Sequence, residues 1–214
     1  MNITSSGPPP KPRLRGVIHL LAIVPTIIAT IILFLRTPEL TRTAVIVYGI
    51  ALVLLFSVSA FYHTPHWEPE TRSKLRRLDH CMIYIFIAGT YTPFCVQLGG
   101  TSYSLLLPVV WGGAILGVLK SLFWINAPRY INAIPFVLLG WAIVPAVDDF
   151  YNVLGLKIVG LLGLGGLMYT AGAIAYARKA PNPNPLIFGY HEIFHTLVVA
   201  AAASHYAAIW MTIT

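Results

Sequence analysis

Long apolar runs separated by short polar breaks make up most of the chain. Seven of these runs are close to the roughly 20 mostly apolar residues that a membrane-spanning helix needs. Their approximate bounds are 17–35, 44–63, 79–98, 103–124, 130–147, 154–177 and 191–212. The breaks carry turn or charge signals, such as Gly99–Gly100, Asp148–Asp149 and the proline-asparagine repeat at 181–185. The pattern predicts an all-α integral membrane protein, a bundle of seven transmembrane helices.

The polar N-terminal segment is predicted to form a short disordered cytoplasmic tail at 1–16, followed by a single seven-helix membrane domain at 17–214. A chain of 214 residues leaves no room for a soluble domain beside it. The first apolar run is too long for the core of a signal peptide, and no clear cleavage site follows it. We therefore interpret it as the first span.

The composition excludes several classes of protein. Hydrophobic residues make up 57% of the chain and charged residues only 10%, whereas an average soluble domain has about 25% charged residues. A water-soluble enzyme and a disordered chain are therefore excluded. The net charge of +7 lies in the breaks between apolar runs, as in membrane proteins, so it does not indicate a nucleic-acid partner. We expect a multi-pass protein of the cell (plasma) membrane.

The distribution of basic residues predicts the orientation. If the N-terminus is cytoplasmic, eleven Lys and Arg side chains fall on the inner side and three on the outer side. The inner set is Lys11, Arg13, Arg15, Arg72, Lys74, Arg76, Arg77, Lys120, Arg129, Arg178 and Lys179, and the outer set is Arg36, Arg42 and Lys157. Since cytoplasmic loops are enriched in Lys and Arg, the N-terminus is predicted inside. An odd number of spans then places the C-terminus outside.

Polar side chains gather at the predicted inner ends of three spans. Ser59 and His63 share one helix face at the end of the second span, because they are one turn apart. Asp79 begins the third span, and His191 and His195, again one turn apart, begin the seventh. Polar groups at membrane depth are costly and usually functional. The topology brings all five residues to the same membrane face.

The spacing of the histidines is typical of a metal site. His191 and His195 can bind one ion, and His63 from another helix supplies a third ligand, which leaves a fourth position open as in catalytic zinc sites. Zinc is favoured, with iron, nickel and copper as alternatives. Asp79 is a candidate to orient or deprotonate a water at the ion, and Ser59 to donate to an oxyanion. The alternatives are a polar cluster without metal and, for Ser59, a bond to its own helix.

Residues 191–195 also match the H-E-x-x-H pattern, in which the glutamate of a metalloprotease is the general base. Few residues follow this motif, so a third ligand has to come from upstream, where His63 is the best candidate. On this ground Glu192 is expected to lie at the interface beside the loop rather than to act as a base.

The remaining histidines have weaker assignments. His205 is expected at a helix contact or in the outer leaflet, and His66 and His80 in a loop or at the interface. For His19, a partner of a ligand and an interfacial residue are equally open.

Three segments together resemble the hemolysin III branch of the progestin and adiponectin receptor (PAQR) superfamily. They are S-A-F-Y-H at 59–63, the run L-R-R-L-D-H-C-M at 75–82 with its continuation to 94, and G-Y-H-E-I-F-H at 189–195. The resemblance implies seven helices with a cytoplasmic N-terminus and zinc bound by the histidines that match His63, His191 and His195. It also implies that the aspartate matching Asp79 approaches the metal through water. One departure is that Pro12 and Arg15 stand where the family often has glutamate and asparagine.

The resemblance also implies a function, since relatives are linked to ceramidase-like hydrolysis and to membrane-lipid homeostasis. The first hypothesis is a zinc-dependent hydrolase of lipid amides or esters, whose partner is a membrane lipid such as ceramide or a fatty-acid derivative. The second is a non-enzymatic sensor or receptor of membrane state, in which the zinc is structural. The third is a cytolysin, as the family name suggests, although the spans show no polar stripe that would line a pore.

Overall fold

The computed structural model describes residues 11–214. Within that range it contains seven α-helices, one short 3-10 helix and no strand beyond an isolated bridge between Asn184 and Phe188. The elements are α1 (Val17–Arg36), α2 (Glu39–His63), α3 (Pro69–Leu98), α4 (Thr101–Phe123), α5 (Arg129–Gly140), η1 (Val144–Ala146), α6 (Val147–Arg178) and α7 (Tyr190–Ile213). The predicted all-α class is confirmed for the described residues.

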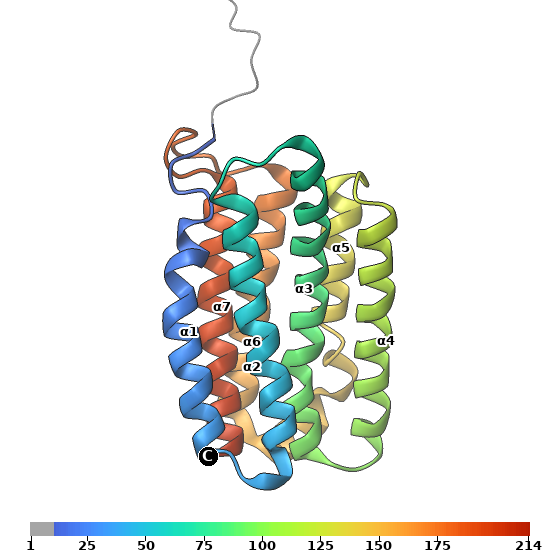
Figure 1. Cartoon of the computed structure of the whole chain (residues 1–214). Helices are drawn as coiled ribbons and strands as arrows, with labels where there is room; N and C mark the ends of the chain where they lie inside the picture. The colour runs from blue at the N-terminus through green and yellow to red at the C-terminus, as the bar shows by residue number, and fades with distance from the viewer. Residues whose placement is uncertain (1–10) are drawn as a thin grey trace, which may run out of the picture.

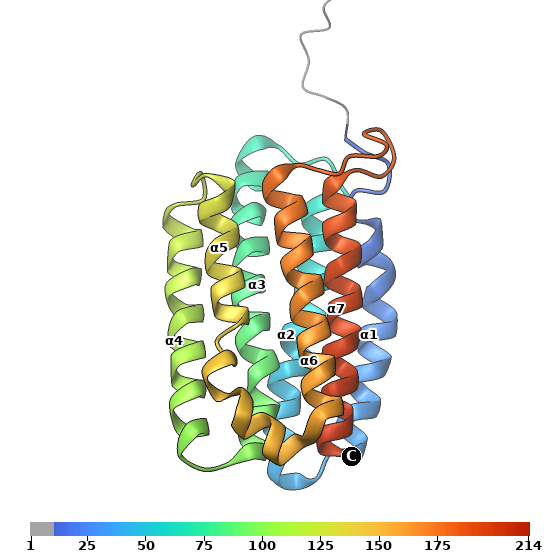
Figure 2. The same cartoon turned by 180° about the vertical axis from the view of Figure 1, so that it is seen from behind.

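The helices form one upright bundle (Figure 1). α7 packs mainly on α6 and α1, α2 on α3 and α1, and α4 on α3. The α2–α3 loop, the α4–α5 turn and the α6–α7 loop lie at one end of the bundle, and the α1–α2 and α3–α4 connections and the C-terminus at the other (Figures 1 and 2). The ends of helices that carry the polar residues singled out in the sequence are therefore together, as predicted.

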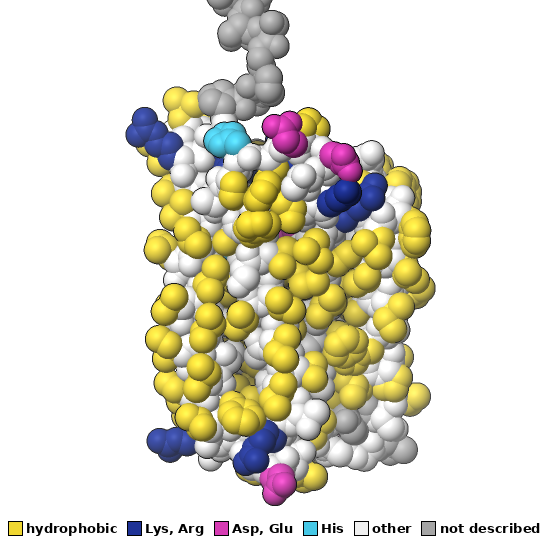
Figure 3. Space-filling view, viewed as in Figure 1, with side chains coloured by type: hydrophobic (Ala, Val, Ile, Leu, Met, Phe, Trp, Pro, Cys, Tyr) yellow, Lys and Arg dark blue, Asp and Glu magenta, His cyan; other side chains and the backbone are white. Residues whose placement is uncertain are grey.

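The surface of the bundle suits lipid. On the face shown in Figure 3, hydrophobic side chains cover the middle of the molecule, and Lys, Arg, Asp and Glu lie at its two ends. Large apolar side chains such as Leu21, Leu35 and Leu116 are 69–73% exposed, which would be costly in water. Within residues 11–214, six helical segments are long and apolar enough to cross a membrane. The protein is a multi-pass integral membrane protein.

The fifth predicted span differs from the sequence prediction. α5 has only 12 residues and ends at Gly140, so by length and composition it counts with α6 as one segment, Arg129–Arg178. The predicted run 130–147 is interrupted between Gly140 and Val144, in the segment before Pro145, whose missing N–H removes one backbone hydrogen bond of a continuous helix. The hydroxyl of Tyr91 replaces two of the backbone hydrogen bonds that are lost at this break. It donates to the Gly140 carbonyl (2.7 Å) and accepts from the Ile143 N–H (3.1 Å).

Residues 1–10 of the predicted tail lie outside the described residues. Residues 11–16 were expected to belong to the same disordered tail, but they contact the bundle. The backbone N–H groups of Arg13 and Leu14 donate to carbonyls of the α6–α7 loop, and Lys11 donates to carbonyls at the end of α2. Their loop partners are more than a hundred residues away, so local composition does not reveal them.

Candidate metal centre

Three histidines meet at one end of the bundle. His63 is the last residue of α2, and His191 and His195 lie on the first two turns of α7. One ring nitrogen of each lies within 4.8 Å of the others, and Nε2 of His63 is 3.2 Å from Nε2 of His191. The ring centroids are 4.5–5.0 Å apart. The bundle therefore brings the three predicted ligands together, one from the end of α2 and two from the start of α7.

This arrangement fits a metal ion. Nitrogens that bind a tetrahedral zinc ion at roughly 2.0–2.1 Å are separated by roughly 3.3–3.4 Å, which is close to the 3.2 Å between His63 and His191. His63 and His195 are buried, and three neutral imidazoles are a donor set that zinc, iron, nickel and copper all accept. The three residues could hold an ion, with its identity left open by the geometry.

Asp79 and Ser59 lie beside the histidines. Oδ2 of Asp79 is 3.8 Å from Nε2 of His63, and the side chain of Ser59 lies beside the same carboxylate. Ser59 is 3% exposed. Among the hydrogen bonds of the described residues, none joins Ser59 to its own helix, the alternative that the sequence left open, and its hydroxyl lies on the side of Asp79. Asp79 is close enough to the imidazoles to face a water or substrate there.

His19 of α1 covers the opposite side of the site. Its ring stacks on that of His195 with centroids 3.9 Å apart and planes only 2° from parallel, and it also contacts Phe56. His19 is 2% exposed, so of the two interpretations left open by the sequence, the structure supports a partner of a ligand. The stacked ring restricts the plane in which His195 can present its nitrogens.

Glu192 lies between the two α7 histidines in sequence but is used differently. Its Oε1 accepts from Nε of Arg15 at 2.5 Å, and its Oε2 accepts from the backbone N–H of Gly189 at 2.8 Å. At 1% exposure it is buried, whereas the sequence predicted an interfacial residue. The charge is tolerated there because Arg15 neutralises it and the helix N-terminus favours an anion. With both oxygens engaged, Glu192 is a poor candidate for a protease base.

The remaining three histidines lie in different surroundings. His66 is exposed in the α2–α3 loop, and His205 packs on α6, where its Nε2 is 3.1 Å from the Leu162 carbonyl; both match expectation. A side chain at Gly165 would collide with the His205 ring, so this glycine permits the contact. Like His205, His80 lines the cavity described below. Sequence reasoning missed it, although its place directly after Asp79 was a signal.

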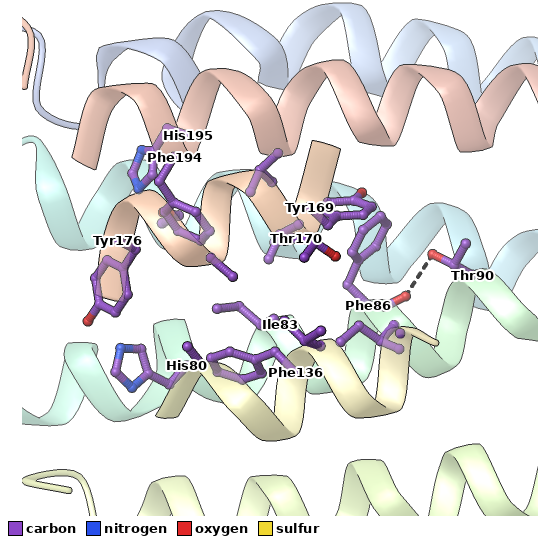
Figure 4. Close-up of a pocket in the computed structure, with 18 of the residues that line it drawn as sticks. His80, Ile83, Phe86, Thr90, Phe136, Tyr169, Thr170, Tyr176, Phe194 and His195 are labelled. Atoms are coloured by element: carbon purple, nitrogen blue, oxygen red, sulfur yellow. Dashed lines mark hydrogen bonds between the residues drawn. The ribbon is translucent and has the colours of Figure 1, made fainter. Parts of the chain in front are cut away.

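An elongated cavity begins at the metal centre and runs into the bundle between α3, α5, α6 and α7. It contains about 1130 Å³ of space not filled by protein atoms, part of it open to the outside. Figure 4 shows Tyr176, His80 and His195 towards one end, Ile83 and Phe136 along the wall, and Tyr169, Thr170 and Thr90 further in. Ser59, Asp79, His191 and His195 all line it. The polar site is therefore the head of a mostly apolar cavity.

The family model described as Haemolysin-III related matches residues 9–206. The chain belongs to this haemolysin III family. It is 32% identical to Hemolysin-3 of Bacillus cereus over 196 residues, which cover 88% of this chain and 85% of that one. It is 31% identical to the Hemolysin-3 homolog of Bacillus subtilis over 165 residues, 76% and 74% of the two chains. The adiponectin receptor protein of Drosophila melanogaster is 30% identical over 214 residues, 89% of this chain and 48% of its own, which agrees with membership of the PAQR superfamily.

Arg15 is the residue of this haemolysin III family member that sequence reasoning left without a role. It departs from the asparagine that the resemblance leads one to expect, and it forms the ion pair with Glu192 across 177 residues of sequence. The signal that would have found it is its charge: a basic residue four positions before a buried histidine, at a membrane boundary, needs an anion or water. The sequence alone does not say which anion.

Proposed function

We propose that this haemolysin III family member is a zinc-dependent hydrolase of membrane lipid amides or esters, of which ceramides are the model substrates. One observation carries the proposal: the three histidines, with Asp79 and Ser59, lie at the head of a long apolar cavity. A polar reaction centre joined to an apolar channel matches a molecule with one hydrolysable bond and a long hydrocarbon chain.

The residues divide the work as follows. His63, His191 and His195 would hold the ion, which when bound acidifies a water and polarises a carbonyl. Asp79 accepts the proton that the attacking water loses and passes it to the leaving amine or alkoxide. Ser59, which lies beside Asp79, would hold this carboxylate by donating its hydroxyl to it. Because its hydroxyl is engaged in this way, we assign it to orienting Asp79 and not to an oxyanion.

The cavity would take the acyl chain. Its lining on α3 extends from Asp79 to Tyr91, about 18 Å along a helix. Ile83 and Phe136 border this path near its head (Figure 4). The apolar walls exclude water from the acyl chain. Because burying the polar end of the substrate deeper in the cavity would be costly, its carbonyl stays at the histidines.

Narrowing the cavity should therefore discriminate between substrates by length. We expect Ile83→Trp to lower turnover of long-chain ceramides on the order of 10²-fold, because the chain can no longer seat and the carbonyl is misplaced. Short-chain ceramides should be affected much less. The measurement is fatty-acid release from a chain-length series by zinc-loaded protein in liposomes. Leu116→Trp, on the exposed face of α4, is the control, and equal losses at every length would contradict the proposal.

We also propose that α5 crosses the membrane as part of a broken span, giving seven crossings with the N-terminus in the cytoplasm. A reporter active only in the cytoplasm should be active when inserted at Asn126, in the α4–α5 turn, and inactive when fused after Thr214. The reason is the excess of Lys and Arg at the end of the bundle that holds this turn. Activity at both positions would show that the crossings between them are even in number, which would rule out seven.

A second candidate function is a sensor in which the metal is a structural clamp. It is favoured by the helix packing, because α2 packs mainly on α1 and α3, and α7 on α1 and α6. An ion between His63 and the α7 histidines would tie together two helices that otherwise share little. Under this hypothesis a chelator lowers the melting temperature, while no member of a broad lipid panel is turned over.

A further inference from the structure

The segment Lys11–Gly16, here called the N-terminal strap, lies across the end of the bundle that holds the metal centre. Lys11 Nζ donates to the carbonyls of Thr64 (2.8 Å) and Pro65 (3.2 Å), directly after the ligand His63. The strap therefore begins attached to the end of α2.

The middle of the strap is attached to the loop that leads into α7. The backbone N–H of Arg13 donates to the Leu186 carbonyl (2.9 Å), and that of Leu14 to the Ile187 carbonyl (3.2 Å). The side chain of Arg13 takes no part in these bonds and is exposed. The strap thus connects the end of α2, which carries His63, to the loop that precedes α7, which carries His191 and His195.

Its last two residues contact the site more closely. Arg15 Nε binds Glu192 at 2.5 Å, with side-chain exposures of 19% and 1%, and Glu192 follows the ligand His191 directly. Gly16 has φ +85°, and a Cβ built there would lie 2.8 Å from Cβ of His63. A glycine is required at this position because the strap crosses over His63 at a distance that admits no side chain.

We propose that Arg15 is a positioning residue of the metal centre, which through Glu192 fixes the first turn of α7 and keeps the strap closed, and so slows exchange of the ion. This inference rests on the metal site of the proposed function but not on lipid hydrolysis. Without Arg15, Glu192 is left as a buried, uncompensated charge one residue from His191. That carboxylate then draws in water or turns towards the ion, and the strap loses its side-chain anchor nearest the site.

The test is the rate at which zinc-loaded protein loses its ion to a chromogenic chelator. Arg15→Gln should release zinc about 10–100-fold faster than wild type, the usual effect of removing a residue that supports metal ligands. Arg15→Lys should recover much of the slow release, because the charge is kept. Arg13→Gln removes the same charge from the neighbouring exposed side chain and should release zinc as wild type does.

Three further variants keep the test decisive if Arg15→Gln folds poorly. Glu192→Gln retains an oxygen for the Gly189 N–H and should also accelerate release, since Arg15 loses its anion. The double variant Arg15→Glu, Glu192→Arg, in which the two charges are exchanged, should release zinc more slowly than Arg15→Glu alone. Release from Arg15→Gln or Glu192→Gln at the wild-type rate, or equal acceleration by Arg13→Gln, overturns the inference. A wild-type protein without zinc overturns the metal site as well, whereas slow zinc release without lipid turnover affects only the hydrolase.

Discussion

Asp79→Asn should lower lipid turnover by about 10²–10⁴-fold, the usual contribution of a general base. The substitution keeps the shape of the side chain and an oxygen that can accept from Ser59, but it removes the charge and the basicity. Oδ2 of Asp79 lies 3.8 Å from Nε2 of His63 and outside the group of three histidines. Zinc content and fold should therefore be retained. The measurement is release of fatty acid from short-chain ceramides, beside elemental analysis of the same preparation.

The matched control for this prediction is Asp148→Asn. Asp148 is an exposed acid on the first turn of α6 and is not among the residues that line the cavity, so its replacement should leave turnover unchanged. Turnover by Asp79→Asn at the wild-type rate would show that Asp79 is not the general base. Loss of zinc from the same variant would instead make Asp79 a ligand.

The second large effect is expected from the double variant His191→Ala, His195→Ala. The wild-type protein should hold about one zinc ion per chain, and the variant close to none, because a single imidazole cannot retain the ion. Binding to the folded state alone also stabilises it. A chelator should therefore lower the melting temperature of the wild type and leave that of the double variant unchanged.

His66→Ala is the control for the double variant, since it removes an exposed histidine close in sequence to His63. Its zinc content and its response to chelator should match the wild type. Full zinc occupancy in the double variant, measured by elemental analysis, would show that the three histidines are not the ligands.

Most of the fold was predictable because the membrane leaves the backbone few choices. An apolar run in lipid has to satisfy its own N–H and C=O groups, so it forms a helix. The predicted runs accordingly reappear as helices with similar bounds, for example 17–35 as α1 (Val17–Arg36). The differences are at 79–98, where α3 already begins at Pro69, at 154–177, where α6 begins at Val147 and includes the predicted break Asp148–Asp149, and at 130–147, where the helix ends at Gly140. There Pro145 opposes a continuous helix, and the compensating hydroxyl comes from Tyr91 on another helix, which no local pattern reveals.

The ligand set was also within reach of the sequence. His191 and His195 lie one turn apart, and alternation of spans across the membrane places His63 at the same end. These inferences need only the helical repeat and the topology. The sequence also placed Ser59 and Asp79 at that membrane face. It did not predict that the two residues lie side by side.

Tertiary structure alone decided how these groups are paired. It places Ser59 beside Asp79, stacks His19 on His195, places His80 in the cavity, and joins Arg15 to Glu192. A helical repeat determines which side chains share a face, but contacts between helices depend on their rotation, depth and crossing, which are determined by packing over the whole bundle. The sequence therefore determined the class of protein and which three histidines come together. The Arg15 partner of the buried Glu192, and the cavity that leads from the histidines, arise only where segments far apart in the sequence meet.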